Sequence, residues 1–445
     1  MVHLSRFSNF GMATLMLIFS ISTNSTLAQS KQPNIIYIMA DDLGYADLSC
    51  YGRKDYETPN LDKLASQGIK FLNAYSAAAV CTPTRAAFMT GRYPARTPVG
   101  LCEPLRGTPK DNVIGLSPEQ VSIATLLKQT GYETALVGKW HLGFLPKYSP
   151  NRNGFDEFFG FLPGGMDYIS HTQRGKPALF ENKNPVNKEG YSTELFSERA
   201  VQYIKQSHSK PFFLSIQFNA PHWPWQAPGD RPYPDSIRYQ PHRNKEGSLE
   251  KYAAMMKSLD DAVGTVVKAV DDGGLSANTI IIFTSDNGGE LYSDMGIYSG
   301  AKGDLWEGGI RVPAFVRWPG VIAANRSTDQ LAITMDWTAT ILAVGGAKPD
   351  PAFPLDGKNL IGICTGKQKI FERTFFWRTF QDEQQKATRD GNWKYLQNDK
   401  GEFLFDVSVD PKEKNDLKTK FKDKFEELRK KYQAWEKTVL IPVPL

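Results

Sequence analysis

The chain has 445 residues, of which 41% are hydrophobic and 23% are charged, and its formal net charge is +5. This length exceeds the usual size of a single domain, so we expect one large domain with a smaller appended unit. The positive charge is mild and the sequence has no basic run or aromatic-interleaved patch, which argues against a nucleic-acid partner.

The first 28 residues have the pattern of a secretory signal peptide. A short polar start with His3 and Arg6 precedes an apolar stretch over residues 11–21, and Thr26-Leu-Ala28 provides a small-residue cleavage site. The apolar stretch is too short to be a stable membrane anchor. The pattern predicts an exported protein, periplasmic or extracellular, without a stable membrane anchor.

Two nearly continuous apolar runs, residues 34–40 and 279–284, predict strands that are buried on both faces of a parallel sheet. The polar residues that follow these strands are Asp41 and Asp42 after the first, and Asp286 and Asn287 after the second. If the strands are neighbours, their ends gather three carboxylates and one amide oxygen, a set suited to calcium or magnesium rather than zinc. Such residues also cap helices and form turns in most proteins, but that role does not explain their shared position at strand ends.

Residues 81–91, Cys-Thr-Pro-Thr-Arg-Ala-Ala-Phe-Met-Thr-Gly, combine a thiol, a proline and an arginine at close spacing. Pro83 fits the first turn of a helix, so Cys81 is expected just before a helix N-terminus, where the dipole favours a developing oxyanion. Taken alone, a cysteine in this context is as well explained as a small buried residue or an ordinary reactive thiol.

A second segment, Gly131-Tyr-Glu-Thr-Ala-Leu-Val-Gly-Lys-Trp-His-Leu-Gly143, follows a predicted amphipathic helix over residues 121–130. Residues 134–137 predict a short buried strand that leads into Lys139 and His141. Both side chains therefore stand at the carboxyl end of a strand, where open α/β sheets hold their ligands.

Together these two segments resemble the two signatures of the sulfatase family, Cys-x-Pro-x-Arg and Gly-Tyr-x-Thr followed by Gly-Lys-Trp-His-x-Gly. In that family a maturing enzyme oxidises the cysteine to formylglycine (3-oxoalanine). One hydroxyl of its hydrate attacks sulfur and the other then expels sulfate, so no second attack by water is needed. The resemblance implies that Cys81 is the modified nucleophile. It also implies that Arg85 and His141 hold the hydrate and that Lys139 offsets the charge of the sulfate.

The resemblance further implies one calcium ion per chain, bound by the residues that match the ligands of the family. These are Asp41, Asp42, Asp286 and Asn287, with residue 81 as a further ligand. Calcium takes about six to eight oxygens, so the site has room for the nucleophile and for a sulfate oxygen. The metal would orient both reactants and lower the pKa of the nucleophile.

Two more segments resemble stretches of the family. Residues 212–218 predict a strand that is followed by Asn-Ala-Pro-His222-Trp-Pro, similar to the family's Pro-His-x-Pro element, and this implies that His222 is the general acid for the leaving alcohol. Residues 299–313 resemble the stretch that carries a sulfate-binding lysine, here Lys302. Glu307 and Arg311 in this stretch are expected to be structural.

The substrate pocket is predicted from the loop-rich stretch over residues 164–174. Its candidate ligands are Asp167, His171 and Arg174, in addition to Lys139, His222 and Lys302. His171 resembles a pocket histidine of family members that act on sugars, and the alternative is a surface loop with a satisfied histidine. The residues expected to frame the same pocket are Glu103, Arg106, Trp377 and Arg378.

The resemblance implies an alkaline-phosphatase-like α/β fold, a large mixed and mostly parallel sheet between helices. Helical patterns at residues 61–67, 194–206 and 249–270 alternate with the strands. Composition rich in Gly and Pro around residues 345–354 marks a boundary between a catalytic domain, 29–345, and a small α+β subdomain, 346–445. The subdomain elements are predicted at residues 374–377, 393–396 and 403–405 for strands and 421–437 for a helix.

Three cysteines remain if Cys81 is converted, so at most one disulfide forms among Cys50, Cys102 and Cys364, and the sequence leaves the pairing open.

Three functions agree with these features. The first is a calcium-dependent sulfatase that cleaves sulfate monoesters of a glycan. The second is a phosphatase or phosphodiesterase of the same superfamily, although such enzymes generally use Thr or Ser and often two zinc ions with more histidines. The third is a non-catalytic sulfoglycan-binding protein, which applies if Cys81 is not oxidised.

Overall fold

The computed structural model describes residues 1–4, 32–108, 111–233, 247–381 and 383–442. Most of the predicted signal segment lies outside the described residues. Within the described part of the chain, no helix combines the length and the apolar character that crossing a bilayer requires.

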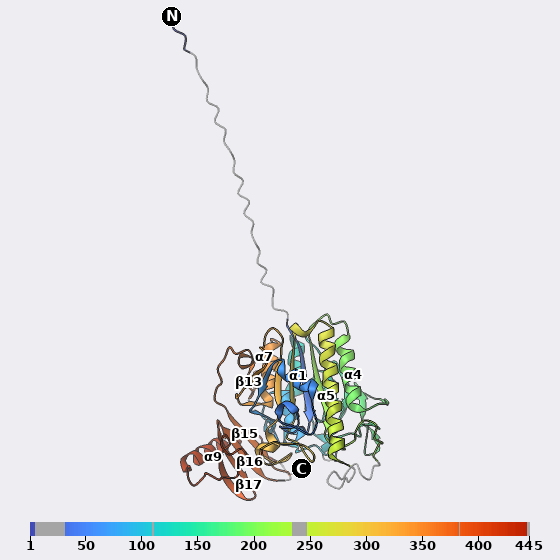
Figure 1. Ribbon diagram of the computed structural model, residues 1–445, viewed down its shortest axis with the longest axis vertical. Helices are drawn as coiled ribbons and strands as arrows, with labels where there is room; N and C mark the ends of the chain where they lie inside the picture. Colours follow the sequence, from blue (N-terminus) through green and yellow to red (C-terminus); the bar gives the residue numbers. More distant parts are fainter. Residues whose placement is uncertain (5–31, 109–110, 234–246, 382, 443–445) are drawn as a thin grey trace. The chain divides into compact units, whose positions relative to one another are not determined.

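A ten-stranded sheet forms the centre of the fold (Figure 1). Its middle consists of five parallel strands in the order β11, β1, β10, β4 and β5. Every residue of β1 is buried, as its apolar sequence predicts for a strand covered on both faces. The bounds of the five strands are β1 Asn34–Asp41, β4 Glu133–Lys139, β5 Glu157–Phe161, β10 Phe212–Pro221 and β11 Thr279–Ser285.

Shorter strands extend the sheet on both sides. Beyond β11, β12 pairs antiparallel with both β11 and β2, and β13 pairs parallel with β2; beyond β5, β8 and β9 form an antiparallel edge. These strands were not predicted, because runs of two to four residues carry little pattern of their own. Their bounds are β2 Ile69–Phe71, β8 Leu179–Glu181, β9 Asn184–Pro185, β12 Ala314–Arg317 and β13 Arg326–Thr328.

Helices cover both faces of the sheet. The side chains of α1, α4 and α5 pack with those of Ile36 and Ile38 on one face, whereas α2, α3 and α7 pack with those of Ile35 and Tyr37 on the other. Figure 1 shows α4 and α5 side by side, with α7 across the sheet from them. The bounds are α1 Pro59–Ser66, α2 Cys81–Thr90, α3 Ile123–Gln129, α4 Ser192–Lys205, α5 Leu249–Asp272 and α7 Thr334–Val344.

The sequence analysis did not predict α7. Almost every residue of this helix is buried, including Trp337 and Ile341. A helix that is apolar on all sides lacks the 3.6-residue alternation that marks a helix half exposed to water.

A four-stranded antiparallel sheet and a helix make up the C-terminal part, with strands in chain order from β15 to β18. The polar sequence of β16, Gln-Lys-Ala-Thr-Arg-Asp, has no strand signal, and pairing on both sides makes it a strand. The predicted fold class is confirmed, while the domain boundary at residues 345 and 346 stays a prediction. The bounds are β15 Thr374–Thr379, β16 Gln385–Asp390, β17 Trp393–Asn398, β18 Gly401–Asp406 and α9 Lys422–Glu436.

Short elements complete the described structure: β3 Ala74–Tyr75, β14 Ala332–Ile333, β6 Thr172–Gln173, β7 Lys176–Pro177, α6 Glu307–Ile310 and α8 Ile361–Cys364.

A buried charge network joins the C-terminal sheet to α6. Glu307 forms ion pairs with Arg311 at 3.1 Å, with Arg389 of β16 at 2.9 Å and with Lys394 of β17 at 3.1 Å. Lys394 also lies 2.8 Å from Glu413. These contacts agree with the structural role expected for Glu307 and Arg311.

Candidate active site

The first signature forms a complete helix. Cys81 is the first residue of α2, Pro83 lies in its first turn, and Gly91 ends it with a left-handed φ of 67°. The Cys81 side chain is 1% exposed, and burial raises the pKa of its thiol. The helix N-terminus therefore places residue 81 where a developing negative charge is stabilised.

His141 contacts Cys81 directly, with 3.2 Å between Nδ1 and Sγ. Its other nitrogen, Nε2, lies 2.8 Å from the carbonyl oxygen of Leu105, so Nε2 carries the hydrogen and Nδ1 is left to accept a proton. Burial first, and the charge of Lys139 second, hold the pKa of His141 well below its usual value. The imidazole is therefore neutral and oriented as a base toward residue 81.

The carboxylates meet at one edge of the sheet, as predicted, because β1 and β11 are adjacent and parallel, with Ala40 opposite Ser285. The backbone N–H of Asp42 donates to Asp286 at 3.1 Å, and the Asn287 amide donates to Asp42 at 2.7 Å. These bonds hold the two strand ends together.

Arg85 lies one helical turn after Cys81 and reaches into the carboxylate cluster. It donates to Asp286 at 2.8 and 3.1 Å and lies 3.3 Å from Asp41. Its position between two acids raises the pKa of the guanidinium, although burial opposes this. Arg85 therefore anchors the nucleophile helix to the ends of β1 and β11.

Two lysines complete the charge pattern. Lys139 Nζ lies 2.6 Å from Asp41, and Lys302 Nζ lies 2.7 Å from Asp42 and 3.2 Å from Glu290. Burial raises the pKa of Asp42 to about 8 despite Lys302, whereas the charges of Lys139 and Arg85 outweigh burial and lower the pKa of Asp41.

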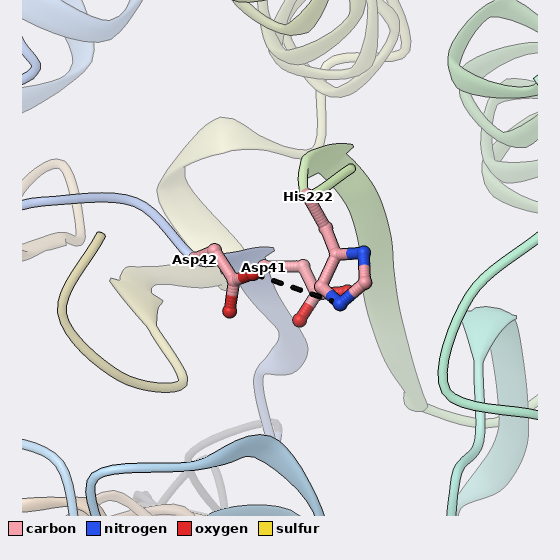
Figure 2. A group of neighbouring side chains, drawn as sticks. All are labelled: Asp41, Asp42 and His222. Carbon is pink, nitrogen blue, oxygen red and sulfur yellow. Dashed lines mark ion pairs between the residues drawn. The ribbon is translucent and has the colours of Figure 1, made fainter. Parts of the chain in front are cut away.

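His222 follows β10 and faces Asp42, with 3.6 Å between Nε2 and the Asp42 carboxylate (Figure 2). Its Nδ1 donates to the carbonyl oxygen of Trp223 at 2.5 Å. Burial, followed by the charges of Lys302 and Lys139, lowers the pKa of His222 well below its usual value. The backbone contact leaves Nε2 as the nitrogen directed into the site.

A cavity of about 600 Å³ opens onto Cys81, a size typical of ligand pockets. The catalytic candidates His141, His222 and Lys302 line it. The cavity is also lined by Arg106, Phe144, Asp167, Arg174, Trp223 and Glu290.

Four residues predicted at the pocket are not among the residues that line the cavity. Trp377 and Arg378 lie elsewhere: Trp377 is buried and donates to the Ser76 carbonyl, and Arg378 donates to the Leu440 carbonyl at 2.8 Å. The Glu103 carboxylate accepts from the backbone N–H groups of residues 380 and 381. His171 is buried outside the cavity lining, with Nδ1 3.1 Å from the Lys188 carbonyl. These backbone partners are 17 to 301 residues away in the sequence, so no local pattern indicates them.

Asp167 and Arg174 do line the cavity, but their surroundings differ. The buried Asp167 carboxylate accepts hydrogen bonds from Ser170 N–H at 2.7 Å, from Gln226 at 2.9 Å and from Tyr233 N–H at 2.9 Å. These bonds order the cavity wall. Arg174 is exposed at its rim.

The sequence comparisons identify the family. The profile of the sulfatase family matches residues 33–347, and a second profile, N-sulphoglucosamine sulphohydrolase, C-terminal, matches residues 300–438. The chain belongs to the sulfatase family. The enzyme is therefore a sulfuric ester hydrolase, and the phosphoesterase alternative is set aside.

Individual relatives agree with this. The sulfatase is 32% identical over 391 residues to N-acetylgalactosamine-6-sulfatase from Canis lupus familiaris, an alignment that covers 82% of this chain and 72% of that protein. It is 37% identical over 350 residues to arylsulfatase J from Mus musculus, covering 75% and 56% of the two chains. The crystal structure of Ps i-CgsB in complex with k-i-k-neocarrahexaose matches with a TM-score of 0.82 and 32% identity, over 93% of this chain and 95% of that chain.

The acidic cluster of the sulfatase fits a metal ion. Asp41, Asp42 and His222 offer ligand atoms within 4.8 Å of one another (Figure 2). Two buried oxygens, Asp41 Oδ1 and Asn287 Oδ1, accept no hydrogen bond within the described structure. Asp41 Oδ1 has Arg85 Nη2 at 3.3 Å as an ion-pair partner but forms no hydrogen bond with it. Buried oxygens with unused acceptor capacity favour a hard cation, and such a cation prefers oxygen ligands to the His222 nitrogen.

Sequence reasoning missed two residues of the sulfatase site. Glu290 forms an ion pair with Lys302. Its position three residues after Asn287, close to the predicted metal ligands, could have identified it as a site residue. Leu105 acts through its backbone carbonyl, for which no side-chain signal exists. Within the described part of the chain, no disulfide joins Cys50, Cys81, Cys102 and Cys364.

Proposed function

We propose that this sulfatase cleaves sulfate monoesters of a carbohydrate by means of formylglycine, derived from Cys81, and one calcium ion. The observation that carries the proposal is the Cys81–His141 contact at the N-terminus of α2, inside a cavity bordered by the carboxylate cluster. When hydrated, formylglycine supplies two hydroxyls on one carbon, so sulfate can leave without a second attack by water.

The proton transfers follow from the two histidines. His141 Nδ1, neutral and directed at residue 81, accepts the proton of a hydroxyl at that position. His222 Nε2 is the nitrogen that faces the site, and it donates to the leaving alcohol. A bound sulfate adds negative charge beside His222, which favours its protonated form against the effect of burial.

The charged side chains hold the sulfate and the metal. Lys139 and Lys302, already at the site, offset the charge of the sulfate. The oxygens of Asp41, Asp42, Asp286 and Asn287 would hold calcium, which when bound supplies positive charge that orients the reactants and activates the nucleophile.

Relatives support a carbohydrate substrate. One relative is named for N-acetylgalactosamine 6-sulfate cleavage, and a structural neighbour holds a neocarrahexaose. Half-buried Trp223 and Phe144 line the cavity and provide apolar surface for a sugar ring. We also propose, from the signal-like N-terminal sequence, that the enzyme is exported and that a maturing enzyme acts on Cys81.

The test is the mass of the tryptic peptide over residues 71–85, from protein isolated from its native host. A formylglycine mass is expected, followed by sulfate release from a panel of sulfated oligosaccharides. An unmodified cysteine would contradict the proposal and favour the non-catalytic binding protein.

A further inference from the structure

Two arginines stand at the rim of the active-site cavity. Arg106 and Arg174 both line it and both are exposed. They come from separate loops, which meet where Arg174 Nη2 donates to the backbone carbonyl of Arg106 at 3.2 Å. The structure therefore brings two arginines that are 68 residues apart in the sequence together in the cavity lining.

The backbone at Arg174 indicates that this placement is not incidental. Arg174 and Gly175 form the two-residue turn between β6 and β7, with φ of 50° and 68°. Asn and Gly are typical of such turns, because other residues tolerate a left-handed φ less well. An arginine held in this strained conformation at a cavity rim is more readily explained by function than by folding.

The arginine pair adjoins the catalytic wall. Arg106 directly follows Leu105, whose carbonyl oxygen accepts from His141 Nε2. Glu290 also lines the cavity, but it is paired with Lys302 near Asp42. The cavity thus has a basic rim beside His141 and an acid beside Lys302. Such an arrangement orients an anionic substrate in one direction.

We propose that Arg106 and Arg174 form a second anion subsite, so that preferred substrates carry another sulfate or carboxylate besides the sulfate that is cleaved. The proposal rests on the carbohydrate sulfatase function proposed above. A guanidinium offers paired N–H groups that match both sulfate and carboxylate oxygens.

The test uses oligosaccharides in matched pairs from sulfated galactans and glycosaminoglycans. The members of a pair share the cleaved sulfate and differ by one other sulfate, or by one carboxylate. We expect wild-type enzyme to have the higher kcat/KM for the two-anion member of at least one pair. The kind of pair that responds tells whether the second anion is sulfate or carboxylate.

The variant is Arg106→Gln with Arg174→Gln. Its kcat/KM should fall at least about tenfold more on the two-anion member than on the one-anion member, the size expected for losing charge-assisted hydrogen bonds. The control is Lys176→Gln, which removes the same charge from the same hairpin at an exposed residue outside the cavity lining and should leave both rates unchanged.

Equal rates within every pair for the wild type, or equal losses on both members for the double variant, would overturn the proposal. If no sugar sulfate is cleaved, the carbohydrate sulfatase function fails instead. Calorimetric binding of the same pairs to Cys81→Ala then decides the subsite: tighter binding of two-anion members that disappears on adding the two Arg→Gln changes supports it, and equal binding refutes it.

Discussion

Glu307→Gln should destabilise the protein strongly. The substitution removes one charge from a network in which Glu307 faces Arg311, Arg389 and Lys394 at 2.9 to 3.1 Å, and each of the four side chains is at most 7% exposed. Lys394 would keep its ion pair with Glu413, whereas Arg311 and Arg389 would lose their ion pairs with residue 307.

The magnitude follows from burial. At an effective dielectric constant of 20, each pair near 3 Å has a Coulomb energy of about 5 kcal/mol, part of which offsets desolvation. Breaking a buried pair from one side costs about 3–5 kcal/mol, and we expect a loss of that size in the free energy of unfolding, measured by urea denaturation.

The matched control is Asp261→Asn. Lys257 and Asp261 lie 2.5 Å apart, but their side chains are 72% and 55% exposed. An exposed pair one helical turn apart contributes about 0.3–0.5 kcal/mol. Equal losses for the two variants would refute the reasoning that burial, and not distance, decides the contribution of an ion pair here.

Three further predictions concern the site and its pH dependence. Cys81→Ala should fold and bind calcium but lose essentially all turnover, and sulfate release by this variant would remove residue 81 from the mechanism. Asp286→Ala should lose both calcium, measured by calorimetry, and activity; unchanged calcium binding would refute the ligand set. Asp47, fully buried, has a pKa raised by burial from 3.8 to about 6. Because the folded state keeps this proton after the unfolded state has lost it, the Asp47 contribution to stability falls by about 3 kcal/mol as the pH rises from about 4 to 6. Urea unfolding should show that the stability of Asp47→Asn rises relative to that of wild type by about 3 kcal/mol as the pH rises across that window, and parallel curves would contradict the assignment.

Much of the fold was predictable from periodicity. The strands β1, β10 and β11 are long, apolar and covered on both faces, so their sequence has a distinct pattern. Helix α5 is amphipathic, with one apolar face that is buried, so its sequence has the 3.6-residue period of such a helix. By contrast, α7 and β16 carry no such pattern. Helix α7 is buried on all sides, and β16 has a polar sequence that is a strand because it pairs with β15 and β17.

The site residues that lie in local motifs were also predictable. Cys81, His141 and His222 each belong to a short segment whose spacing is itself distinctive. Trp377 and Arg378 were predicted at the pocket because aromatic and charged side chains are typical of sugar-binding sites. They do not line the cavity, and no neighbouring residue in the sequence indicates where they pack. Their contacts, with residues 76 and 440, are distant in sequence.

The sequence by itself determined the chemistry: the family, the candidate nucleophile and the acids at the strand ends, because each depends on residues close together in the chain. Only the tertiary structure decided which groups meet, such as Glu290 with Lys302 and Arg106 with Arg174. It also decided which nitrogen of His141 faces residue 81, through a backbone carbonyl at Leu105. The physical reason is that these contacts join residues 12 to 68 positions apart, two of them through a backbone carbonyl, and no local pattern encodes such a contact.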